Sequence, residues 1–139
     1  MNFKDAVTLY FQRSDAMQTY WGFYITVVLG LIAFVGSVKS PSRLTALVLF
    51  LSIAFCGFAL VNLGGLYSVA KQRIASRDIA VDLSAHEPEN GRNARDAIIR
   101  TMTPPAESGV IVVHVLGDVL TLAALWWLAA QSTRRRSSG

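Results

Sequence analysis

The chain has 139 residues, of which 53% are hydrophobic and 16% are charged, and its formal net charge is +4. The charged share is low beside the roughly 25% of an ordinary soluble domain. The basic residues gather at the ends of apolar runs, where lipid headgroups would meet them, so the net charge does not indicate nucleic-acid binding. This composition argues against a soluble domain and favours a lipid bilayer as the surroundings.

Long stretches of the chain carry no charge. Residues 16–38 and 44–70 contain no Lys, Arg, Asp or Glu, and residues 109–132 contain only Asp118. A soluble helix would interrupt such runs every turn or two to keep one face wet. Nearly uncharged apolar runs of at least about 18 residues are typical of membrane spans. The sequence therefore predicts an all-α, polytopic membrane protein with three transmembrane helices in a single membrane domain.

The first predicted element is a short amphipathic stretch, residues 1–17. Phe3, Ala6, Val7 and Tyr10 recur there at helical spacing, and the polar residues fall mainly on the rest of the helical wheel. This pattern predicts a helix that lies in the membrane interface and runs into the first span.

Five further segments follow along the chain. They are span one (18–38), span two (44–69), an extramembrane connector (70–108), span three (109–130) and a basic tail (131–139). Span one would be about 31 Å long at about 1.5 Å per residue, which is close to one hydrocarbon thickness. Pro41 ends it in a turn so short that spans one and two should be antiparallel neighbours. The connector is expected to be partly helical.

Aromatic and basic residues stand near the predicted ends of the spans, where they are expected to anchor the chain at the membrane interfaces. The predicted anchors are Trp21, Trp126, Trp127, Arg134, Arg135 and Arg136. Three spans put the termini on opposite sides of the membrane. The plain count of Lys and Arg favours a cytoplasmic connector, whereas the triple arginine after span three favours a cytoplasmic C-terminus. We expect the latter, in a multi-pass cell-membrane protein with the general appearance of small bacterial inner-membrane proteins.

Four polar side chains form the candidate site inside the predicted spans: Tyr24, Asn62, His114 and Asp118. Because successive spans alternate in direction, all four are expected in the leaflet on the connector side. His114 and Asp118 are four residues apart, so they share a helical face and are close enough to pair. A carboxylate at this depth costs about 3 kcal/mol and needs a partner. Two interpretations stay open: hydrogen bonding between helices, or handling of a proton, ion or ligand.

Small residues recur along span one at spacings of four, four, three and four. They are Gly22, Thr26, Gly30, Ala33 and Ser37. Such faces let helix backbones approach closely. The face is expected to pack either against the other two spans or against another chain.

The sequence offers no catalytic or cofactor motif, and its two His and one Cys fall short of a metal site with three or four ligands. We therefore expect no enzyme activity, no metal and no cofactor. The leading hypothesis is a structural or accessory membrane subunit that packs with other chains or with itself. A small oligomeric transporter or channel that uses Asp118 and His114 is the alternative. A haem-bearing anchor subunit is a third reading, with His114 as one axial ligand and the other supplied by Met or by another chain.

Overall fold

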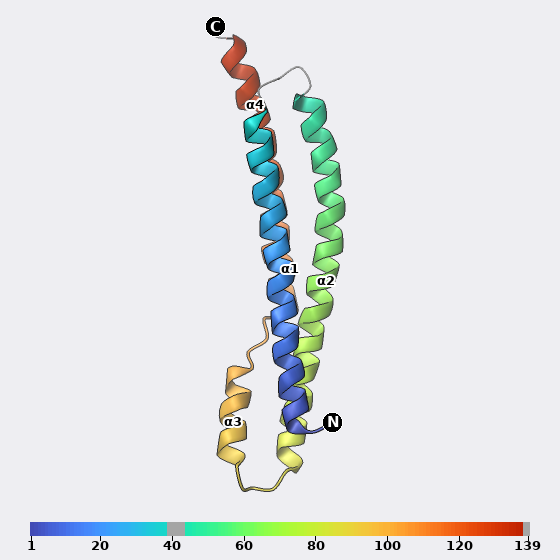
Figure 1. Ribbon diagram of the computed structural model, residues 1–139, viewed down its shortest axis with the longest axis vertical. Helices are drawn as coiled ribbons and strands as arrows, with labels where there is room; N and C mark the ends of the chain where they lie inside the picture. Colours follow the sequence, from blue (N-terminus) through green and yellow to red (C-terminus); the bar gives the residue numbers. More distant parts are fainter. Residues whose placement is uncertain (39–43, 138–139) are drawn as a thin grey trace. The chain divides into compact units, whose positions relative to one another are not determined.

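A computed structural model describes residues 1–38 and 44–137 of the chain, apart from the side chains of residues 133 and 135–137. The described residues form four helices and contain no strand (Figure 1). The helices are α1 (Phe3–Ser37), α2 (Leu44–His86), α3 (Arg92–Thr101) and α4 (Glu107–Ser137). The predicted turn at Pro41 lies outside the described residues, as do the side chains of Arg135 and Arg136.

Three of these helices, α1, α2 and α4, are long and apolar enough to cross a membrane. This confirms the all-helical class and the three apolar helices that the charge-free runs predict. Several Ser and Thr hydroxyls inside them are satisfied within their own helix. Thr26 Oγ1 donates to the Gly22 carbonyl at 2.8 Å, and Ser52 Oγ donates to the Val48 carbonyl at 2.7 Å. Such bonds let Ser and Thr sit in an apolar helix with no polar partner outside it.

The chain divides into two compact units, which we describe one at a time. The first unit holds residues 1–20 and 65–111, and the second holds residues 21–64 and 112–139. The first unit contains α3 and the connector, which is partly helical as predicted. The polar side chains of the candidate site belong to the second unit.

The apolar face of residues 1–17 is covered by protein. In the first unit Phe3, Ala6 and Tyr10 pack in one cluster with Ala80 of α2 and with Met102. Residues 3–17 are thus helical and run on into span one as predicted, and their placement in the membrane interface stays a prediction. Because α2 continues beyond residue 69 to His86, it gives this face a protein neighbour, and α1 runs from Phe3 through the start of span one without a break.

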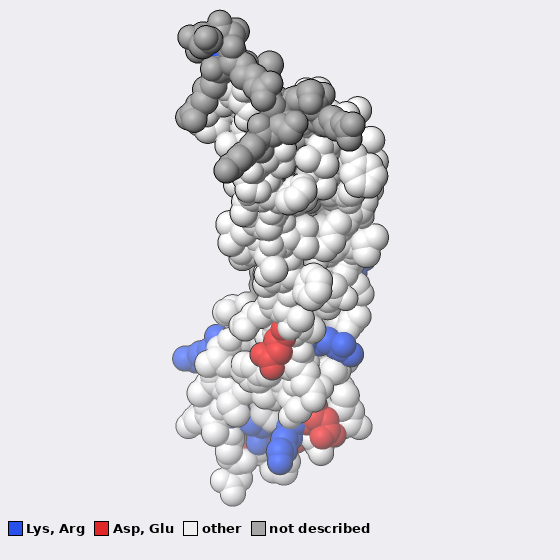
Figure 2. Space-filling model, turned by 45° about the horizontal axis from the view of Figure 1, so that its top comes forward, with Lys and Arg blue, Asp and Glu red and all other residues white. Residues whose placement is uncertain are grey.

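The second unit is apolar on the outside as well as inside. Val35, Val48 and Leu125 are buried in one of its clusters. Its outer surface carries large apolar side chains, among them Leu60 and Val61, which are 72% and 78% exposed. Exposing such a surface is unfavourable in water but not in lipid. Figure 2 shows the charged side chains gathered over one part of the visible face and the neighbouring part uncharged.

Candidate intramembrane polar site

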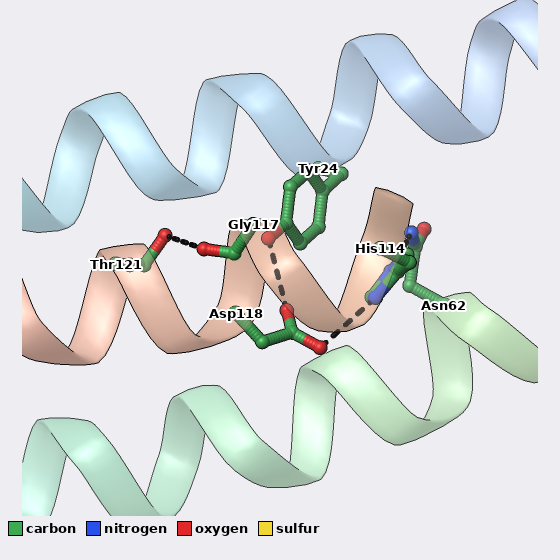
Figure 3. Close-up of polar contacts among 6 residues, drawn as sticks. All are labelled: Tyr24, Asn62, His114, Gly117, Asp118 and Thr121. Carbon is green, nitrogen blue, oxygen red and sulfur yellow. Dashed lines mark hydrogen bonds and ion pairs between the residues drawn. The ribbon is translucent and has the colours of Figure 1, made fainter. Parts of the chain in front are cut away.

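The four polar residues predicted from the sequence meet in one hydrogen-bonded chain (Figure 3). The Tyr24 hydroxyl of α1 donates to Asp118 Oδ1 at 2.9 Å. His114 Nδ1 lies 3.0 Å from Asp118 Oδ2, one turn away on α4. On the other side of the imidazole, His114 Nε2 lies 3.1 Å from Asn62 Nδ2 of α2. The chain therefore links all three long helices through side chains at the same level.

The donors and acceptors fix one protonation pattern for this arrangement. An amide nitrogen can only donate, so Asn62 Nδ2 requires His114 Nε2 to be an acceptor. The imidazole is then neutral, with its proton on Nδ1 donated to Asp118. Each carboxyl oxygen of Asp118 then accepts one hydrogen bond, one from Tyr24 and one from His114.

Burial raises the free-energy cost of losing any of these hydrogen bonds. His114 is fully buried, and Tyr24 and Asn62 are each 5% exposed. The His114 ring lies 4.5 Å from the Tyr24 ring and 5.8 Å from that of Trp21, centroid to centroid. An unpaired polar group here would cost about 1–3 kcal/mol, so each partner is needed to keep the others in place.

Trp21 and Gly117 belong to the site although the sequence pattern did not assign them to it. Trp21 was predicted as an interface anchor, but it is half-buried with its ring against His114. Its position three residues before Tyr24 puts the two on one helical face, which was the available signal. Gly117 gives the Tyr24 hydroxyl room, because a Cβ atom there would lie 2.7 Å from that oxygen. Nothing in the sequence separates this glycine from the others.

Asp118 also borders a hollow between α2 and α4. The hollow has a volume of about 220 Å³, and the other residues that line it are apolar: Phe55, Cys56, Ala59, Leu60, Leu63 and Val115. The Asp118 side chain keeps 21% of its surface exposed, more than any of its hydrogen-bonding partners. Asp118 is therefore the most exposed of the four hydrogen-bonded residues of the site.

The arrangement offers little to a metal or a haem. In the described part of the chain, no group of three or more His, Cys, Asp or Glu residues is placed to hold a metal ion. Both ring nitrogens of His114 are engaged in hydrogen bonds. An iron ligand would have to give up its bond to Asn62 or Asp118, so this geometry does not favour the axial-ligand reading.

The small-residue face of α1 points away from the protein. Every member of it is exposed, namely Gly22, Thr26, Gly30, Ala33 and Ser37. A Cβ atom added at Gly22 or Gly30 would meet no atom within 4 Å. The three long helices therefore do not use this face to pack on one another.

The predicted interface anchors Trp126 and Trp127 are exposed, at 41% and 64%, and so is Arg134.

Comparison with known proteins adds no relative. No family model matches the sequence, and neither the curated proteins nor the solved structures contain a significant match.

Proposed function

We propose that this chain is a non-enzymatic, multi-pass membrane subunit that packs through the small-residue face of α1 against a second copy of itself. The outward position of that face carries the proposal, because close backbone approach is the main use of such faces between membrane helices. Tyr24, Asn62 and His114 are buried and bonded within the site, so they leave the α1 face free for this contact.

A pair of glycine substitutions tests the packing face. Gly30→Leu should shift the protein from dimer to monomer in mild detergent, because it fills the face with a bulky side chain. Gly57→Leu is the matched control, since Gly57 of α2 is equally open and lies outside this face. Mass measured by light scattering reports the state. A wild-type monomer, or a dimer that Gly30→Leu leaves intact, would contradict the proposal.

Disulfide trapping places the contact. In a Cys56→Ala background, Gly30→Cys should form a linked dimer on oxidation in membranes, and Gly57→Cys should not. Equal linking at both positions would mean that copies meet without a preferred face.

We propose a bacterial inner membrane with the C-terminus in the cytoplasm. Arg134, Arg135 and Arg136 directly after span three support this orientation, because translocating such a cluster is costly. A reporter that is active only after export, fused behind Gly139, should be inactive, and one inserted in the 87–91 loop should be active. The reverse pattern would reverse the orientation.

The second candidate is a small oligomeric transporter or channel that moves protons or a solute past Asp118. The partial exposure of this carboxylate beside the hollow favours it. Asp118→Asn is a clean test, because asparagine keeps an acceptor for His114 and can donate to the Tyr24 oxygen, so packing is preserved while the titratable group is lost. Proton flux into proteoliposomes should then disappear, and Asp82→Asn, on an exposed part of α2, should leave it intact. Absence of flux in the wild type would remove this candidate.

A further inference from the structure

In the first unit, Arg73 of α2 contacts the face of α1 on which Arg13 lies. Arg73 of α2 donates through Nη2 to the Tyr10 hydroxyl at 2.8 Å and through Nη1 to Met17 Sδ at 3.4 Å. Its guanidinium also lies over the Tyr10 ring, 4.9 Å from the centroid. Arg13 is three residues after Tyr10 and four before Met17 on α1, so it shares the face on which Arg73 rests.

The ion pairs of the described chain join other residues, and neither Arg13 nor Arg73 takes part in one. Both side chains are half-buried, and the Nε atom of each is buried without a hydrogen-bond partner. Two partly desolvated positive charges on one face repel each other, and an anion placed against both would remove that cost.

Both arginines stand at the same distance from the apolar runs. Arg13 is three residues before the charge-free stretch 16–38, and Arg73 is three residues after the stretch 44–70. At about 1.5 Å per residue this is about 4.5 Å beyond the end of each stretch. With α1 and α2 in a membrane, that is the level of the headgroup phosphates.

We propose that Arg13 and Arg73 form a binding site for a phosphate-bearing anion, supplied by the headgroup of an anionic lipid. The lipid source depends on the membrane placement proposed above, whereas the anion site itself does not. Guanidinium groups bind phosphate oxygens through paired, charge-assisted hydrogen bonds. Arg73 is already oriented by Tyr10 and Met17, and Arg13, which makes no polar contact within the described residues, is free to turn toward the same anion.

The experiment compares thermal unfolding of the full chain in three settings. These are phosphatidylcholine vesicles, the same vesicles containing phosphatidylglycerol, and detergent micelles with added inorganic phosphate. Phosphatidylglycerol should raise the unfolding temperature of the wild type, because a ligand that binds the folded state stabilises it. The increase should be absent in Arg13→Gln and present in Arg100→Gln, an exposed arginine of α3 that serves as the matched control.

Arg13→Gln also carries its own check on folding. In phosphatidylcholine alone it should be as stable as the wild type or more so, because it removes a repulsion and Arg13 forms no hydrogen bond or ion pair within the described residues. Affinity for phosphatidylglycerol, measured by native mass spectrometry, should fall about tenfold or more. Arg73→Lys should bind with intermediate affinity, since it keeps the charge and loses the planar fork.

The outcomes separate the sources of the anion. A shift given by phosphatidylglycerol and not by inorganic phosphate supports a lipid headgroup. A shift that inorganic phosphate also gives, and that Arg13→Gln abolishes, supports the anion site with a free phosphate as its ligand. Equal shifts in Arg13→Gln and the wild type, or an equal loss in Arg100→Gln, would overturn the proposal. Failure of the chain to enter vesicles would instead count against the membrane placement, because the micelle measurement does not depend on it.

Discussion

Asp118 accepts hydrogen bonds from two helices at once, one on each carboxylate oxygen. His114 carries the connection onward to Asn62 of a third helix. A carboxylate in an apolar bundle is costly unless its lone pairs are used. Any packing of α1, α2 and α4 that separates Asp118 from its partners would leave it unpaired among apolar side chains, so such packings are disfavoured. The site thus specifies the arrangement of the second unit, whatever else it does.

Gly117 is the position at which this geometry is most easily broken. Gly117→Ala would place a Cβ atom 2.7 Å from the Tyr24 hydroxyl and push it away from Asp118. We expect a loss of about 1–3 kcal/mol in the free energy of unfolding, despite the gain of up to about 1 kcal/mol that alanine brings to a helix. Gly109→Ala on the same helix meets no atom within 4 Å and should be neutral or stabilising. Unfolding in mixed detergent micelles compares the two, and equal stability would rule out the steric role.

The four hydrogen-bonded members of the site were predictable, and their detailed contacts were not. Polar residues in apolar runs need partners, so depth along each span was enough to group Tyr24, Asn62, His114 and Asp118. The direction of each bond depends on rotamers and helix rotation, which composition does not encode. For the same reason a glycine that makes room for a hydroxyl, such as Gly117, looks like any other helical glycine in the sequence.

At the scale of elements, periodicity predicted the helices correctly, but it does not distinguish a helix face covered by protein from one that faces lipid. An apolar face on residues 1–17 is equally suited to lipid and to protein, because both remove it from water. In the structure the long α2 brings Ala80 to that face. The α1 face of Gly22 and Gly30 was ambiguous in the same way, and the other described residues leave it uncovered.

The loop before α3 is held by one side chain. Arg95 is buried and donates to the carbonyl oxygens of Pro88 at 2.7 Å and Asn90 at 3.4 Å, while Nη1 lies 3.4 Å from a carboxylate oxygen of Glu87. Arg95→Gln should therefore loosen residues 87–91 and speed their amide hydrogen exchange about tenfold or more, because the charge-assisted bonds from the buried guanidinium to the loop carbonyls are lost.

Arg92→Gln is the control for this loop. Arg92 forms an exposed pair with Glu89 at 3.8 Å, and pairs of this kind contribute little to stability. Its exchange pattern should match the wild type. Loosening of the loop by both substitutions alike would show that overall charge, not the Arg95 contacts, holds it.

For the molecule as a whole, the two proposed functions differ in whether water reaches the hollow beside Asp118. Cys56 lines that hollow and its side chain is exposed, so it reports directly on the surroundings. Maleimides react with the thiolate, which forms only where water can stabilise its charge. The structural-subunit proposal expects lipid at this position, and the transporter alternative expects water.

We predict that a membrane-impermeant maleimide, applied to opened membranes so that both sides are accessible, will not label Cys56 until detergent denatures the protein. Asn93→Cys in a Cys56→Ala background should label rapidly, because Asn93 is exposed on α3 outside the predicted spans. Labelling of Cys56 at the rate of Asn93→Cys would put water in the hollow. That result would favour proton or solute movement past Asp118, since the carboxylate would then exchange protons with the aqueous phase. Protection of Cys56 together with dimer formation through the α1 face would instead mean that the polar site holds the helices together and is closed to water.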